Sequence, residues 1–248
     1  MNRYLSTVGL YARWNLYKIL TIILITALAA GFLVYRYPIG TVVLDENYVS
    51  AETGETTQLV ASYPKLEGVV SGSGAPVVCA AGFAAIVAVM SLTGCGYGVK
   101  TEYTIRRLRV KERQAVLLWA AYHAVLLVIY WAVLAAVLYG VMHLRLQMDV
   151  PVDYFVYMYG PQSMLLLCYT DTFLHHLLPL RDVAAWGVGI ASVLAAALST
   201  VLFSYRQRRG SFSVMVLLAL AGTIGSFFCG LGENANALLM VLLLGVAG

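Results

Sequence analysis

The segment from Lys100 to Arg113, KTEYTIRRLRVKER, combines six basic side chains with two acidic ones and an interleaved apolar pattern. On an α-helix, Arg106, Arg109 and Arg113 lie along one side, because residues three, four and seven apart share a face. Two interpretations stay open. The segment docks against a partner protein, or its charges anchor two span ends at anionic lipid headgroups, at about 1 kcal/mol for each basic residue.

Asp171, His175 and His176 form a second polar group, in the stretch TDTFLHHLLP. Adjacent side chains on a helix point about 100° apart, and no HExxH motif or third spaced ligand accompanies the two histidines. We therefore predict no metal site. The stretch is interpreted as a membrane-surface helix that ends at Pro179.

Other chemistries lack their motifs. The sequence contains no pattern typical of intramembrane proteolysis, and His123, the one histidine well inside an apolar run, is interpreted as a packed polar residue. No GxxxxGKS or GxxxxGKT loop is present, so the chain cannot hydrolyse ATP by a Walker-type mechanism unaided. We expect no enzyme activity and no cofactor. The four dispersed cysteines are interpreted as small buried apolar residues.

Composition places most of the chain in lipid. Its 248 residues are 61% hydrophobic and 11% charged, with a mean hydropathy of +0.81, whereas soluble domains carry about 25% charged residues. The formal charge of +4 comes from basic residues that flank apolar runs and form no groove with interleaved aromatic residues. Anionic lipid headgroups, and not nucleic acid, are the expected partners of these charges.

Basic residues also orient the chain. Twelve of its sixteen Lys and Arg residues lie in three clusters separated by long apolar runs. The clusters are Arg3, Arg13 and Lys18; Lys100, Arg106, Arg107, Arg109, Lys111 and Arg113; and Arg206, Arg208 and Arg209. By the positive-inside rule we expect all three in the cytoplasm.

The apolar runs predict an all-α, polytopic transmembrane helix bundle of about six spans, a single domain over residues 1–248. The predicted spans are 18–35, 76–98, 114–142, 183–204, 212–230 and 232–248. Residues 1–17 are predicted to form an interfacial helix, and residues 99–113 and 205–211 to be cytoplasmic. The chain is then a multi-pass protein of the cell membrane with both termini cytoplasmic.

Two segments are predicted to be extracytoplasmic. Residues 36–75 mix short β-branched runs with Gly, Pro and acids, which is typical of a small loop or hairpin. Residues 143–182 are harder to place, because they mix apolar runs with aspartates and histidines. A single crossing there would leave the last basic cluster outside, so we expect a re-entrant or interfacial element.

An interfacial helix, six spans and a charged element between the second and third span together resemble the membrane subunit of bacterial ABC exporters of the type-2 class. The resemblance covers the whole chain in layout. In sequence it is carried by YTIRRLRVKER, similar to the loop through which such permeases contact their ATPase, and by TDTFLHHLLPLRD. The class usually carries re-entrant helices between its last two spans. In this chain that connection is only residues 230–236, and the larger outer segments follow the first and third spans.

The resemblance implies a permease that couples to a separate ABC ATPase subunit and pairs with a second copy or a related permease. By position, the residues with the coupling role are Glu102, Tyr103, Arg106, Arg107, Arg109, Glu112 and Arg113. It identifies no substrate-binding residues. The alternative is a non-transporting accessory or sensor protein whose extracytoplasmic segments bind a ligand or partner.

Overall fold

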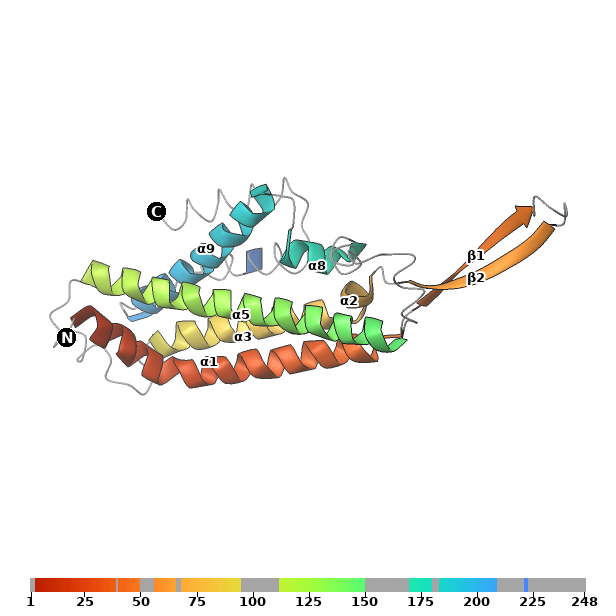
Figure 1. Cartoon of the computed structure of the whole chain (residues 1–248). Helices are drawn as coiled ribbons and strands as arrows, with labels where there is room; N and C mark the ends of the chain where they lie inside the picture. Colours follow the sequence, from red (N-terminus) through yellow and green to blue (C-terminus); the bar gives the residue numbers. More distant parts are fainter. Residues whose placement is uncertain are drawn as a thin grey trace.

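The structure, a computed structural model, describes residues 3–38, 40–49, 56–65, 68–94, 112–149, 170–179, 183–208 and 221–222. Its elements are α1 (Arg3–Arg36), β1 (Gly40–Val49), β2 (Thr56–Lys65), α2 (Val69–Gly72), α3 (Ala75–Gly94), α5 (Glu112–Asp149), α8 (Thr172–Leu177) and α9 (Val183–Arg208). Figure 1 shows a bundle of long helices with a narrow hairpin projecting from one end.

Four of these helices are long and apolar enough to cross a membrane. The candidate spans are Ala12–Arg36, Ala75–Leu92, Gln114–Arg145 and Ala185–Gln207. The shortest has 18 residues and covers about 27 Å, close to the thickness of a hydrocarbon core. The structure therefore confirms a helical fold with four candidate spans, which correspond to the first four predicted spans. The predicted spans 212–230 and 232–248 lie outside the described residues, apart from Ala221 and Gly222.

Helix α1 is longer than expected. The sequence predicted an interfacial helix over residues 1–17 and a separate span over 18–35, but α1 continues from Arg3 to Arg36 without a break. No proline interrupts this stretch, and Pro38 follows its end, where the missing N–H group and the fixed φ disfavour further helix. The expected break near residue 17 does not occur; an interfacial position for the first turns stays a prediction.

The long helices pack in pairs around a shared core. Both α1 and α9 pack against α3 and α5. The core includes Ile19 of α1, Ile86 of α3, Leu134 of α5 and Ala196 of α9, all of them buried. Successive long helices run in opposite directions along the bundle (Figure 1).

Large apolar side chains also cover the outside of the bundle. On α1, Leu24, Leu28 and Phe32 are 60%, 63% and 57% exposed. Such a continuous apolar surface is unusual for a protein surrounded by water. It fits a bundle whose surroundings are lipid.

Strands β1 and β2 form an antiparallel hairpin, with a register that runs from Gly40 opposite Lys65 to Val49 opposite Thr56. The hairpin lies within residues 36–75, where the composition predicted a loop or hairpin. Figure 1 shows it extending away from the helices beyond the C-terminal end of α1. Its extracytoplasmic location stays a prediction.

Candidate functional site

Two of the seven predicted coupling residues lie in the described part of the chain. Glu112 and Arg113 are the first two residues of α5. The other five, Glu102, Tyr103, Arg106, Arg107 and Arg109, fall within residues 95–111, outside the described residues. Their coupling role stays a prediction.

The long helices bring basic segments to one end of the bundle. There α1 begins, α3 ends, α5 begins and α9 ends (Figure 1). Described basic residues toward this end include Arg13 on α1 and Arg206 near the end of α9. We call this end the basic end, and the opposite end, from which the hairpin projects, the hairpin end. The chain leaves α3 and enters α5 at the basic end.

At the hairpin end, the buried carboxylate of Asp171 joins two short helices. Its Oδ1 accepts hydrogen bonds from the backbone N–H groups of Phe173 and Leu174, at 3.0 and 3.2 Å, as the N-cap of α8. Its Oδ2 accepts from the N–H groups of Val70 and Ser71, at 2.9 and 3.1 Å. The first N–H groups of a helix lack intrahelical partners. One carboxylate therefore satisfies four of them and holds α8 against α2.

Arg145 joins α5 to the end of α1. Its Nη1 donates to the carbonyl oxygen of Val34 at 3.2 Å and to that of Tyr37, and its guanidinium carbon lies 5.9 Å from the ring centroid of Tyr35. Carbonyl groups at a helix C-terminus lack intrahelical partners and carry partial negative charge, so a cation there is stabilising. Arg145 thus ties the C-terminal part of α5 to the C-terminal end of α1 at the hairpin end.

Helix α8 lies alongside α5 (Figure 1). The indole Nε1 of Trp131 donates to the carbonyl oxygen of Leu177 at 3.0 Å. Trp131 precedes Arg145 by 14 residues, so it lies about 21 Å along α5 from Arg145, further from the hairpin end. Asp171, at the other end of α8, contacts α2. Part of the segment predicted as re-entrant or interfacial therefore packs against the side of the bundle; its depth in a membrane stays a prediction.

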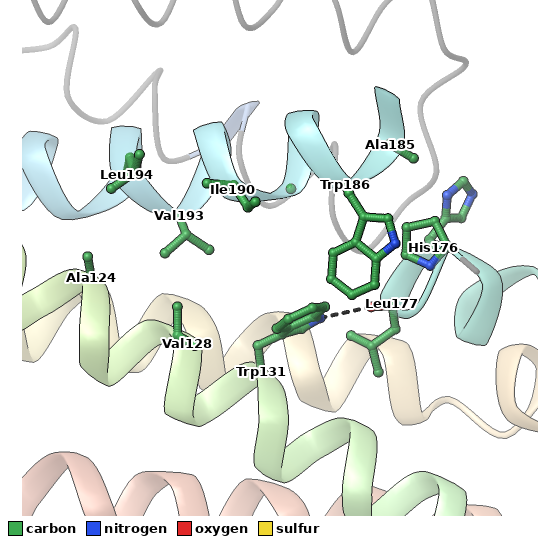
Figure 2. A pocket seen from close by; sticks show the side chains of 12 residues that line it. Ala124, Val128, Trp131, His176, Leu177, Ala185, Trp186, Ile190, Val193 and Leu194 are labelled. Carbon is green, nitrogen blue, oxygen red and sulfur yellow. Dashed lines mark hydrogen bonds between the residues drawn. The ribbon is translucent and has the colours of Figure 1, made fainter. Parts of the chain in front are cut away.

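A pocket of about 110 Å³ lies where α5, α8 and α9 meet. Figure 2 shows Val128 and Trp131 facing Trp186, Ile190 and Val193 across it, with α8 at one end. The rings of Trp131 and Trp186 meet edge to face, with centroids 5.3 Å apart. The pocket is lined almost entirely by apolar groups, and its lining residues Ile190 and Leu194 are exposed.

His176 is the only titratable side chain among the described residues that line the pocket. Burial, and then the neighbouring His175, lower the pKa of His176. Because the ordinary pKa of histidine is about 6.5, a lowered value leaves the ring neutral at pH 7. The pocket therefore presents no charge to a ligand near neutral pH.

Closer to the basic end, His123 of α5 and Thr200 of α9 form a buried polar contact. Nδ1 of His123 lies 2.8 Å from Oγ1 of Thr200, and both side chains are fully buried. Thr200 donates its hydroxyl hydrogen to the carbonyl oxygen of Ala197 at 2.7 Å, so it accepts the hydrogen of Nδ1. Nε2 of His123 has no hydrogen-bond partner among the described residues. His123 is thus a packed polar residue, with an acceptor left inside a candidate span.

The carboxylate of Asp171 is already used by backbone N–H groups, and the absence of a metal site at Asp171, His175 and His176 stays a prediction. Both carboxylate oxygens of Asp171 accept backbone hydrogen bonds. In the part of the chain that the structure describes, no three His, Cys, Asp or Glu side chains come together as metal ligands do. Asp171 has a structural explanation as a helix cap.

Sequence reasoning missed the role of Asp171, the Arg145 contact and the pocket between Trp131 and Trp186. Asp171 had a local signal, because an aspartate before a short apolar helix is typical of an N-cap. The Arg145 contact and the pocket had no local signal in the sequence. Arg145 lies 111 residues from Val34, and no local spacing rule relates positions so far apart.

No protein-family model, curated protein or solved structure matches the chain. A function is therefore inferred from its residues and their geometry.

Proposed function

We propose that the chain is the membrane-spanning subunit of an ABC-type export system, and that residues 99–113 contact a separate ATPase. One observation carries the proposal. The connection between α3 and α5 leaves and re-enters the bundle at the basic end, beside the start of α1 and the end of α9 (Figure 1). An ATPase on that side of the membrane would meet the basic segment between α3 and α5.

Helix α5 provides a route from the ATPase to the rest of the bundle. It is continuous from Glu112 to Asp149, so a displacement of its first turn moves the whole helix. Thr200 of α9 and the end of α1 are hydrogen-bonded to His123 and Arg145 of α5. In the proposed complex, two copies, or one copy and a related permease, pair in the membrane, and ATP hydrolysis takes place in the partner.

Affinity capture tests this proposal. Tagged wild-type protein is extracted in mild detergent and compared with a variant carrying Arg106→Glu, Arg107→Glu and Arg109→Glu. The matched control carries the same change at the other predicted cytoplasmic connection, Arg206→Glu, Arg208→Glu and Arg209→Glu. We expect an ATPase to be recovered with wild type and control, and lost from the first variant, because reversed charges repel a surface that binds a basic segment.

All three proteins must first be shown to insert with the same orientation, since basic residues also determine topology. Recovery of no ATPase with wild type would contradict the proposal. Equal recovery with all three proteins would leave an ATPase partner but remove residues 99–113 from the contact.

The hairpin end favours a second candidate, a non-transporting accessory or sensor protein. Ten-residue strands project beyond the bundle there. If the chain has this function, wild type captures a partner protein that is not an ATPase. Replacing residues 40–65 by a Gly/Ser linker should then abolish the capture of that partner. The same capture experiment therefore separates the two candidates.

A further inference from the structure

We propose that the pocket between α5, α8 and α9 binds the end of an acyl chain of a phospholipid from the surrounding bilayer. This inference goes beyond the proposed function, because it requires neither an ATPase partner nor transport. It rests on the position of the pocket, on its size and neutrality, and on the small residues that leave it open.

The pocket opens onto the part of the surface where lipid is expected. Its walls come from two candidate spans, Gln114–Arg145 and Ala185–Gln207. Of the lining residues, Val128, Ile190 and Leu194 are 47%, 59% and 50% exposed, so the wall of the pocket continues into the outer surface of the bundle. Spans are surrounded by hydrocarbon. An acyl chain in that hydrocarbon meets Val128, Ile190 and Leu194 at the outer edge of the pocket.

Size and chemistry select an apolar, uncharged occupant. The pocket measures about 110 Å³, somewhat smaller than an engineered apolar cavity of about 150 Å³ that stays free of water and binds benzene. It therefore holds a few methylene groups and not a headgroup. Neutral His176 offers no charge to an anionic group, and the indole N–H of Trp131 is already donated to Leu177. Bilayer phospholipid is the source of apolar chains present at the highest concentration around a span.

Small residues leave the space open. Ala124 on α5 and Gly189 on α9 both line the pocket, and a leucine at either position would occupy it. Each has a close neighbour that serves as a matched control. Ala121 of α5 is exposed and is not part of the lining. Gly187 of α9 has nothing within 4 Å of an added Cβ.

Photolabelling tests the proposal. The full chain is reconstituted in vesicles of phosphatidylethanolamine and phosphatidylglycerol that contain phosphatidylethanolamine with a diazirine near the end of one acyl chain. After irradiation, labelled residues are mapped by mass spectrometry. The exposed apolar face of α1, around Leu24 and Leu28, serves as the internal standard for contact with bulk lipid.

We expect wild type to be labelled at the pocket more strongly than at the standard. Gly189→Leu and Ala124→Leu each reduce the pocket label by about tenfold, the factor expected when two terminal methylene groups lose their buried position. Gly187→Leu and Ala121→Leu leave it unchanged. Two independent filling variants keep the test decisive if one of them fails to fold.

Equal pocket labelling in the filling variants and their controls would overturn the proposal. It would also be overturned if wild type shows no pocket label above the standard.

Discussion

The carboxylate of Asp171 accepts four backbone hydrogen bonds from two short helices, and its side chain is 1% exposed. In Asp171→Ala these buried N–H groups lose their acceptor. We expect the free energy of unfolding to fall by about 2–4 kcal/mol, from the loss of two caps and the burial of unsatisfied donors. Thermal unfolding in lipid nanodiscs measures the loss. Amide hydrogen exchange over residues 172–178 should become faster.

The neighbouring Thr172→Ala is the control for Asp171→Ala. Thr172 is exposed, so its truncation should change stability by no more than about 0.5 kcal/mol. Asp171→Asn keeps one acceptor oxygen, so its loss of unfolding free energy should lie between those of Asp171→Ala and Thr172→Ala. If Asp171→Ala unfolds like wild type and exchange at α8 is unchanged, Asp171 does not hold α8 against α2.

Among the elements, α1, α3 and α5 meet at Gly82 of α3. A Cβ added there would lie 2.8 Å from the Tyr130 hydroxyl oxygen, and it would come even closer to the side chain of Thr26. The same hydroxyl donates to the carbonyl oxygen of Cys79 at 2.6 Å. Gly82→Ala therefore requires the side chains of Thr26 and Tyr130, or the helices that carry them, to shift. We expect a loss of about 1–3 kcal/mol in the free energy of unfolding, the usual cost of overpacking.

Gly140→Ala separates the packing effect from helix propensity. An added Cβ at Gly140 of α5 meets nothing within 4 Å, so alanine there should be neutral or stabilise by up to about 1 kcal/mol. The double variant Gly82→Ala with Thr26→Ala should recover part of the loss, because it removes the nearest obstructing atoms. Similar unfolding of Gly82→Ala and Gly140→Ala would show that α3 does not need a glycine for packing.

For the whole molecule, the hairpin and the basic end lie at opposite ends of the bundle (Figure 1). We predict that the positive-inside rule orients it with the basic end in the cytoplasm. In a background with all four cysteines replaced by alanine, Asn47→Cys in β1 should then react with a membrane-impermeant maleimide in intact cells. Gln207→Cys, near the end of α9, should react only after permeabilisation.

Both positions must react in permeabilised cells, which shows that each cysteine is accessible. If both cysteines react from the same side of the membrane, the chain cannot cross the membrane an odd number of times between residues 47 and 207, which would contradict the prediction. Reaction of Gln207→Cys alone in intact cells would reverse the orientation and remove the proposed ATPase contact from the cytoplasm.

Four spans and the position of the hairpin followed from composition. A span is a local property of the chain, because hydrocarbon requires about twenty consecutive apolar residues with internally satisfied backbone groups. Residues 76–98 and 114–142 met that condition without reference to any other part of the chain. The predicted end of the first span, at residue 35, lies next to the observed end of α1 at Arg36. The coupling residues rest on the resemblance, with Glu112 and Arg113 described as the start of α5.

The arrangement around α8 needed the tertiary structure. Asp171 and Val70 are 101 residues apart, and Trp131 and Leu177 are 46 apart. Neither hydrogen bond follows from local spacing, because each depends on how separate helices pass one another. The pocket also depends on how separate helices pack, because Ala124 and Gly189 leave a space only where α5 and α9 come together. By itself the sequence determined which segments prefer hydrocarbon, because that preference belongs to each segment alone. Only the packing decided which polar groups meet and where space remains.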